Sequence, residues 1–114
     1  MQYFNCLSKM DAIFKALADP TRRKLLDRLF EQQGQTLTEL IDGLEMRRQS
    51  ATRHLAVLED AQLVTCRWHG REKLHYLNPV PIAEINRRWL DKFSGDRAAA
   101  ILNLRDALQE KDHE

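Results

Sequence analysis

The fold is decided by residues 36–77, which read TLTELIDGLEMRRQSATRHLAVLEDAQLVTCRWHGREKLHYL. The stretch opens with Thr36-x-x-Glu39, the pattern of a helix capping box, and predicts a short helix that ends at the Asp42-Gly43 turn. A second helix is predicted over residues 47–61, because apolar side chains recur there at helical spacing. Its buried stripe is narrow and consists of Ala51, Leu55, Leu58 and Gln62. Most of the surface of this second helix is therefore expected to lie outside the core.

The same stretch ends in two runs of strand-forming residues. Residues 63–68 and 73–77 are rich in such residues and predict a β-hairpin. If the hairpin turns at Gly70-Arg71, Cys66 and His75 face each other across the strands. Two short helices joined by a turn and followed directly by a hairpin make a winged helix-turn-helix.

The flanking sequence predicts more helix on both sides. Ser8-x-x-Asp11 resembles a capping box and predicts the start of a first helix. Asp19-Pro20 then ends that helix and begins a second one over residues 20–32. From Pro81 a long helical stretch follows, interrupted at residues 94–96. The expected fold is mainly α with a small β-hairpin, in the order α-α-α-α-β-β-α.

Length and composition exclude several classes of protein. The chain has 114 residues, which suits one domain. Its apolar runs are far shorter than the ~20 residues that cross a bilayer. Its two cysteines, Cys6 and Cys66, stand far apart, and no CxxC pair or catalytic motif such as G-x-S-x-G occurs. We therefore expect a cytoplasmic protein that is not an enzyme and has no membrane contact, no cofactor and no metal site.

Charge is segregated along the chain although the formal net charge is only +1. Residues 21–28 carry a net charge of +3 and residues 47–73 also +3, whereas residues 29–46 carry −4. A basic face on a nearly neutral protein favours contact with nucleic acid.

The outer face of the helix over 47–61 supplies the candidates for contact with DNA. Gln49 and Arg53 lie opposite the buried stripe, where Arg53 suits guanine and Gln49 suits adenine, and Arg48 is the third base-contacting candidate. The predicted backbone contacts are short hydroxyls and basic residues at helix starts and at the hairpin tip. They are Arg47, Ser50, Thr52, Arg22, Arg23, Arg71 and His69.

The apolar surface of the C-terminal stretch is large for so short a chain, which favours a dimer seam. The candidate interface residues are Ile13, Ile82, Ile85, Trp89, Phe93, Ile101, Leu104 and Leu108. In this interpretation residues 1–114 form a single domain, with a DNA-binding core over 10–79 and dimerisation helices over 80–111. The two recognition helices of a homodimer then enter successive major grooves of a palindromic site.

Residues 13–79 resemble the ArsR-type family of bacterial winged-helix transcription repressors. The resemblance rests on three pieces, IFKALADPTRRKLLDRL, RRQSATRHLAVLEDAQLV and GREKLHYLNP. It implies a homodimeric repressor that binds operator DNA. Metal-sensing members carry a Cys-rich third helix, or Asp/His and His/Glu pairs on the last helix, and this chain has neither. It therefore resembles the members without an evident metal site, and its small-molecule inducer is unknown.

Two positions depart from the family pattern. The family often has Ser where Arg47 stands, so we expect the recognition helix to lack a side-chain N-cap. The family often has Gly where Gln62 stands, so we expect a left-handed residue at the end of that helix.

Some alternatives remain open at this stage. A winged helix can serve as a protein-interaction or RNA-binding module, which needs neither an outward Gln49 and Arg53 nor a symmetric dimer. Cys66 and His75 could share a metal or make the thiol reactive, but only two ligands are visible and packing is the default. His54, at the edge of the buried stripe, is expected to be a structural hydrogen-bonding residue.

Overall fold

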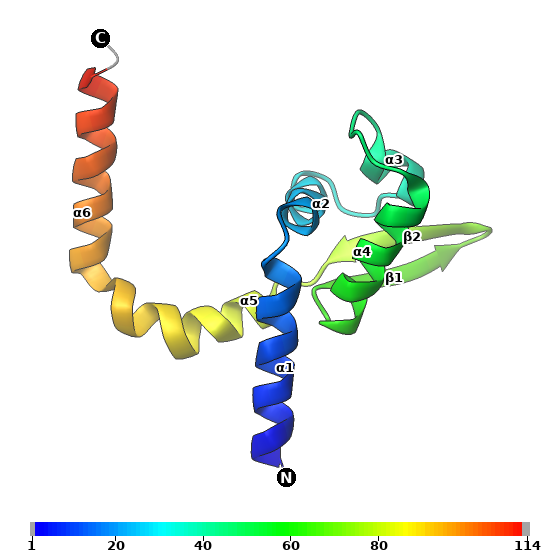
Figure 1. Ribbon diagram of the computed structural model, residues 1–114, viewed down its shortest axis with the longest axis horizontal. Helices are drawn as coiled ribbons and strands as arrows, with labels where there is room; N and C mark the ends of the chain where they lie inside the picture. Colours follow the sequence, from blue (N-terminus) through cyan, green and yellow to red (C-terminus); the bar gives the residue numbers. More distant parts are fainter. Residues whose placement is uncertain (1, 113–114) are drawn as a thin grey trace. The chain divides into compact units, whose positions relative to one another are not determined.

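The computed structural model describes residues 2–112, with the side chains of residues 9–91, 93, 95 and 97–110. The elements are α1 (Gln2–Leu17), α2 (Pro20–Glu31), α3 (Leu37–Ile41), α4 (Arg48–Asp60), β1 (Val64–His69), β2 (Glu72–Leu77), α5 (Val80–Ile85), the π-helical turn η1 (Asn86–Leu90) and α6 (Asp91–Asp112) (Figure 1). Residues 1–82 and residues 83–114 form two compact units. Among residues 2–112, no helix combines the length and the apolar character that a bilayer crossing requires.

The predicted helix starts at Asp19 and Thr36 are confirmed. The Asp19 carboxylate accepts hydrogen bonds from the backbone amides of Thr21 at 2.8 Å and Arg22 at 3.2 Å, and Pro20 occupies the first helical position. Thr36 and Glu39 form a reciprocal capping box, with bonds of 3.2 and 3.1 Å. These caps satisfy amides that have no partner within their own helices, so both helices begin where the sequence predicts.

The first helix begins earlier than predicted. Ser8-x-x-Asp11 was expected to open it, but α1 starts at Gln2. The segment from Gln2 to Leu7 contains no Gly or Pro, so nothing in it interrupts a helix.

The core of the first unit consists of leucines from α2, α3, α4 and the start of the hairpin. Those with the least exposed surface are Leu25, Leu29, Leu40, Leu58 and Leu63. Ala51 and Leu55 are buried on α4 as predicted. Gln62, which the sequence placed on the same stripe, is exposed instead, because α4 ends at Asp60 and Gln62 adopts the left-handed conformation with φ of 64°. That left-handed residue was expected from the family pattern.

The hairpin has the predicted register. Its turn lies at Gly70-Arg71, and Cys66 on β1 pairs with His75 on β2. A third segment joins this sheet through one isolated bridge, in which the His75 amide donates to the Gln35 carbonyl at 2.8 Å and the Gln35 amide donates back at 3.2 Å. The bridge fixes the loop between α2 and α3 against β2.

The base of the hairpin is closed by Asn78. Its backbone amide donates to the Leu63 carbonyl at 2.8 Å, and its side-chain Nδ2 donates to the Gln62 carbonyl at 2.8 Å. The hairpin is therefore anchored at the end of α4.

The second unit contains the predicted interruption of the C-terminal helix. Gly95, with φ of 34° and ψ of −174°, departs from helical geometry inside α6. Before this kink the rings of Trp89 and Phe93 stack with their centroids 5.6 Å apart.

Candidate nucleic-acid interface

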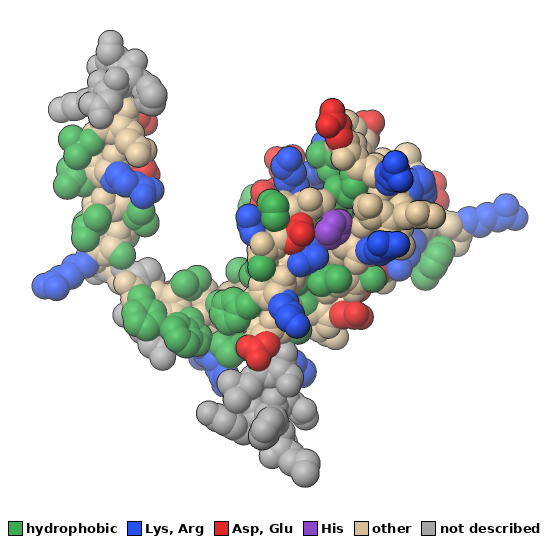
Figure 2. Space-filling view, viewed as in Figure 1, with side chains coloured by type: hydrophobic (Ala, Val, Ile, Leu, Met, Phe, Trp, Pro, Cys, Tyr) green, Lys and Arg blue, Asp and Glu red, His purple; other side chains and the backbone are tan. Residues whose placement is uncertain are grey.

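The outer face of α4 carries polar side chains that the fold does not use. Gln49 and Arg53 are exposed in the N-terminal half of the helix, and within the described part of the chain no hydrogen bond or ion pair engages either side chain. Arg48 is also exposed, but its Nη1 donates a 2.8 Å hydrogen bond to the Thr38 hydroxyl in α3. Figure 2 shows Lys and Arg side chains gathered over α4 and at the tip of the hairpin.

The two hydroxyls beside this face differ. Thr52 donates its hydroxyl proton to the Arg48 carbonyl at 2.8 Å, one helical turn back. A hydroxyl has one proton and phosphate only accepts, so Thr52 has to leave this bond before it can contact a phosphate. Ser50 is exposed on α4. Arg47 stands at the N-cap without a side-chain capping bond, as expected.

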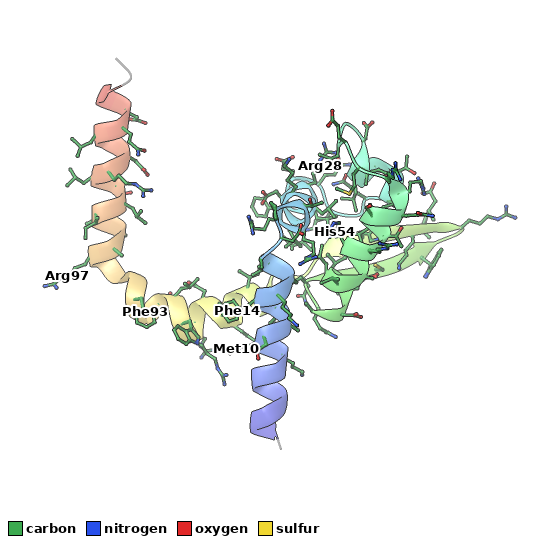
Figure 3. The ribbon with its side chains drawn as sticks, viewed as in Figure 1. Met10, Phe14, Arg28, His54, Phe93 and Arg97 are labelled. Atoms are coloured by element: carbon green, nitrogen blue, oxygen red, sulfur yellow. The ribbon has the colours of Figure 1, made fainter. Side chains whose placement is uncertain are left out.

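Arg22 and Arg23 are engaged within the fold. Nε and Nη2 of Arg22 donate to two carbonyl oxygens in the last turn of α1, at 2.8 and 2.9 Å. Nη1 of Arg23 donates to the Leu17 carbonyl at 2.6 Å. Carbonyls in the last turn of a helix lack the amides of a further turn, although the Lys15 carbonyl also accepts the Ala18 amide at 3.2 Å. A cation also complements the negative end of the helix. Nδ1 of His54 lies 3.3 Å from Nη1 of Arg22, which confirms the structural role expected for His54. Figure 3 marks the position of His54 on α4.

Two further polar residues hold helix ends together, and sequence reasoning missed both. Nη1 of Arg28 donates to the carbonyls of Leu40 at 3.1 Å and Asp42 at 2.6 Å, at the end of α3. The side-chain Nε2 of the buried Gln35 donates to the carbonyls of Arg28 at 2.8 Å and Gln32 at 2.6 Å, at the end of α2. Neither residue stands at a recognisable cap position, so only the folded chain reveals these contacts.

The tip of the hairpin presents His69 and Arg71, both exposed, on either side of Gly70. Gly70 has φ of 64°, a conformation that glycine adopts without steric cost. Trp68 on β1 is 69% exposed, although nothing in the sequence pattern singled it out. The hairpin thus extends a basic tip and a large aromatic side chain into solvent.

A cleft of about 960 Å³ lies between α3, α4 and the hairpin. Arg48 and Trp68 contribute to its walls, and Glu59, Lys73 and His75 line it as well. Side chains of α4, the predicted recognition helix, and of the hairpin therefore line the same cleft.

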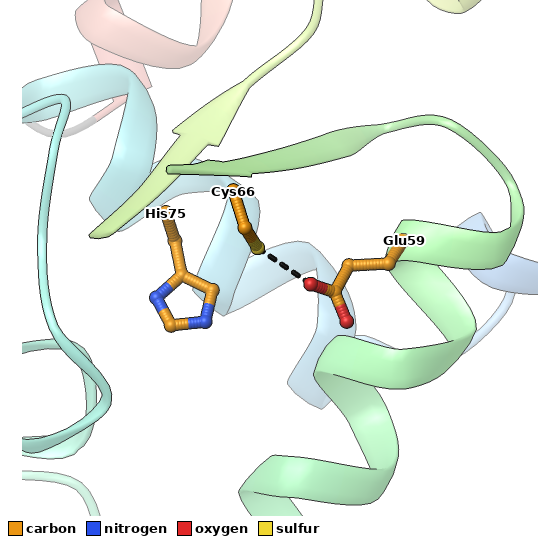
Figure 4. A group of neighbouring side chains, drawn as sticks. All are labelled: Glu59, Cys66 and His75. Atoms are coloured by element: carbon orange, nitrogen blue, oxygen red, sulfur yellow. Dashed lines mark hydrogen bonds between the residues drawn. The ribbon is translucent and has the colours of Figure 1, made fainter. Parts of the chain in front are cut away.

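Three potential ligand residues converge beside this cleft (Figure 4). Glu59 comes from the last turn of α4, Cys66 from β1 and His75 from β2. The Cys66 thiol donates to Oε1 of Glu59, and Nζ of Lys73 lies 3.0 Å from the same oxygen. His75 is 3% exposed, and its Nδ1 lies 2.9 Å from the Gln35 carbonyl.

Electrostatics keep the thiol of this cluster neutral. Burial and the hydrogen bond to Glu59 raise the pKa of Cys66 to about 12, so the thiol is protonated at neutral pH and is a weak nucleophile. Burial opposes ionisation of Glu59, but the hydrogen bonds from Cys66 and Lys73 outweigh it and hold the pKa of Glu59 below its ordinary value of 4.5. The bond to Glu59 raises the pKa of Lys73. The side chain of Cys6 lies outside the described part of the chain.

The apolar residues predicted for a dimer seam divide into two groups. Those exposed in the structure are Ile82, Trp89, Phe93, Ile101, Leu104 and Leu108. Ile13 and Ile85 are buried, with 6% and 5% of their surface exposed, and have little left to offer a partner. Phe14, which follows Ile13 in the sequence and was not predicted for the seam, is 46% exposed. Figure 2 shows hydrophobic side chains exposed along the C-terminal helix.

The helical core, the hairpin after α4 and the unengaged polar face of α4 together define a winged helix-turn-helix protein. Comparison with known proteins supports this class. A family model for a helix-turn-helix domain matches residues 17–67. The chain is 41% identical over 87 residues to YuzN, an uncharacterized HTH-type transcriptional regulator of Bacillus subtilis, covering 71% of this chain and 95% of YuzN.

Two other similar proteins extend the comparison. The transcriptional repressor SdpR of Bacillus subtilis is 29% identical over 84 residues, covering 74% of this chain and 91% of SdpR. A crystal structure of an ArsR family transcriptional regulator superimposes with a TM-score of 0.67 at 32% identity, covering 75% of this chain and 86% of that one. The chain belongs to the ArsR-type family of winged helix-turn-helix transcriptional regulators.

Proposed function

We propose that this regulator is a homodimeric repressor that binds a palindromic DNA operator, with the N-terminal half of α4 in the major groove. One observation carries the proposal. Gln49 and Arg53 expose polar groups that the described part of the chain leaves without partners, at the position where a recognition helix meets base edges. We also propose that the protein acts in the cytoplasm, where the operator lies. Its proposed function involves no catalytic step.

Each side chain of α4 receives a role that follows from its donors. Arg53 forms a fork of two parallel donors that fits O6 and N7 of guanine, and the Gln49 amide fits N6 and N7 of adenine. Arg48 reaches a base through the donors that its bond to Thr38 leaves free. Arg47 and Ser50, at the start of the helix, contact phosphates.

The hairpin serves as the wing, with Arg71 and His69 at the phosphate backbone or the minor groove. Phosphate contact by Arg22, Arg23 and Thr52 stays a prediction from the sequence. Their internal hydrogen bonds favour structural roles instead.

The dimer is proposed on the exposed apolar side chains of the C-terminal unit, because surface of this kind is uncommon on a monomer. Association stabilises the folded state by mass action, so the melting temperature should rise with protein concentration. The change Phe93→Ser should weaken this dependence, whereas Asn103→Ser, in the same unit, should leave it intact. A monomer in sedimentation at micromolar concentration, with a melting temperature independent of concentration, contradicts the proposed interface.

Selection of bound sequences from random duplex DNA tests the function. We expect enrichment of an imperfect palindrome whose half-sites lie about one helical turn apart. The variant with Gln49→Ala and Arg53→Ala should lose the enrichment. Arg97→Ala, which removes one exposed charge from the other unit, should keep it. Absence of enrichment with the natural chain favours a protein-interaction or RNA-binding module.

A further inference from the structure

We propose that Glu59, Cys66 and His75 form a binding site for one zinc-class divalent metal ion between the recognition helix and the wing. The sequence pattern pairs Cys66 with His75, and no metal site was expected because only these two ligands were visible. The structure brings in the third ligand. One carboxylate oxygen, one sulfur and one imidazole nitrogen lie within 4.8 Å of one another.

The types of donor atom fit zinc. Zn²⁺ is bound by Cys, His and Asp or Glu, and open sites hold it with three protein ligands and a water as the fourth. Tetrahedral coordination separates ligand atoms by about 3.4 Å, so the observed cluster needs shifts of only about 1 Å to close around an ion. The cross-strand pairing of Cys66 with His75 fixes two of the ligands before any metal arrives.

His75 is held in the tautomer that a metal requires. A carbonyl oxygen only accepts, so the 2.9 Å contact with Gln35 places the ring proton on Nδ1. With this proton on Nδ1, Nε2 is the nitrogen that can offer a lone pair to a metal, and no hydrogen bond occupies it among the described residues. A histidine ligand that donates its other N–H to a backbone carbonyl is the usual arrangement in metal sites. Because His75 is 3% exposed, the packing also limits rotation of its ring.

Two anionic ligands offset the charge of the metal ion itself. The thiol proton leaves to solvent as the sulfur–metal bond forms, so Cys66 and Glu59 supply two negative charges to a dication. Lys73 contacts Oε1 of Glu59, as does the Cys66 thiol, so Oε2 is available to the ion. Metal binding therefore replaces the bond between thiol and carboxylate and does not require Lys73 to leave.

The alternative to a metal site is a purely structural hydrogen-bonded cluster, and cobalt spectroscopy distinguishes the two. Co²⁺ is titrated into the reduced full-length chain without oxygen and without DNA. We expect one Co²⁺ per chain, with a thiolate-to-cobalt charge-transfer band in the near ultraviolet. Zn²⁺ should displace the cobalt and remove the band, because it binds more tightly to such ligands. Absence of the band, with cobalt left unbound, overturns the proposal without bearing on DNA binding.

Matched variants assign the ligands. The chain has two cysteines, so Cys66→Ser should abolish the band whereas Cys6→Ser should retain it. Glu59→Gln still accepts a hydrogen bond from the thiol but loses its charge, and should raise the Kd for Co²⁺ at least about tenfold. Circular dichroism checks that each variant is folded. A band that survives Cys66→Ser, or a Kd unchanged by Glu59→Gln, rejects the assigned site.

Trp68 provides a second readout that does not depend on a cysteine substitution. It lines the same cleft as Glu59 and His75, and the other tryptophan of the chain, Trp89, can be removed by Trp89→Phe. Co²⁺ should quench Trp68 fluorescence in that background with the same Kd as the charge-transfer band. Unquenched fluorescence at saturating Co²⁺ shows that the ion binds elsewhere and overturns the proposal.

Discussion

The arginines of α2 and of α4 are alike in sequence and differ in the folded chain. Both helices lie in segments with a net charge of +3, and both carry arginines near their N-terminal ends. On α2, Arg22, Arg23 and Arg28 donate to backbone carbonyls of α1 or α3. On α4, Arg53 extends from the exposed face, and among the described residues it makes no such bond.

The difference shows that a basic cluster can have two unrelated uses. Carbonyls at the end of a helix need donors from outside the helix, and a guanidinium supplies several at once. An arginine engaged in this way stabilises the fold. An arginine without such bonds adds little to stability, and its charge is available to a ligand. Substitutions that separate folding stability from DNA affinity test this comparison.

The largest effect is expected from Arg22→Ala. The variant loses the hydrogen bonds to the end of α1 and to His54, which should lower the free energy of unfolding by about 2–3 kcal/mol. Urea denaturation followed by circular dichroism measures the change. Lys24→Ala, which removes an equal charge from an exposed position two residues away, should stay within about 0.5 kcal/mol of the natural chain. Equal stability of the two variants contradicts the structural role of Arg22.

Arg53→Ala should show the opposite pattern. Its stability should change by no more than about 0.5 kcal/mol, whereas affinity for the selected operator should fall by about 1–3 kcal/mol. Preference should relax at one base pair per half-site, and Gln49→Ala should behave as a milder form of the same change. Binding titrations with operator and with random duplex measure both quantities. If Arg53→Ala weakens both duplexes by the same factor, its assignment as a base reader is wrong.

Arg47→Ser sharpens the comparison at one position. Arg47 occupies the N-cap of α4 without a capping bond, so a serine there should add about 0.5–1 kcal/mol of stability. The same change removes a charge near the phosphates and should reduce the salt dependence of DNA binding by about one unit. Thermal melting and binding at several salt concentrations test the two parts. Arg47→Ala serves as the control, since it removes the charge without adding a cap.

The smallest effect concerns Asp19, beside Arg22. The bond from the Arg22 amide is the main influence that holds the pKa of Asp19 below its ordinary value of 3.8. A lowered carboxyl pKa contributes stability above that ordinary value, and the contribution is lost as the pH falls through the folded-state pKa. Asp19→Asn keeps a capping side chain, so it should be slightly less stable near neutrality and converge with the natural chain below pH 3.8. Denaturation midpoints across this range, with Asp27→Asn as control, check the convergence.

Local signals account for what the sequence predicted well. The caps at Asp19 and Thr36 depend on residues three or fewer positions apart, and the turn at Gly70-Arg71 sets the register that pairs Cys66 with His75. Gly95 likewise marked the interruption of the last helix. In each case the deciding residues are neighbours in the chain.

Contacts between separate elements account for what was missed. Arg28 and Gln35 end helices through bonds that span up to 14 residues, and no short pattern encodes them. In the sequence, Glu59 is indistinguishable from other acidic residues on the surface of a helix. Its contact with Cys66 exists only because the hairpin packs beside α4. On the outer face of α4, the sequence proposed Gln49 and Arg53, and their readout of bases stays a prediction.

The closure of the hairpin by Asn78 has a consequence for how such proteins diversify. Because two hydrogen bonds join its base to the end of α4, the tip can change length without moving the helix. A Cβ atom built at Gly70 meets no heavy atom within 4 Å, so the space around the tip is open, and lengthening a loop costs only about 0.6 kcal/mol per doubling. We therefore expect the wing tip to tolerate insertions, so a short peptide tag placed there could report on the wing.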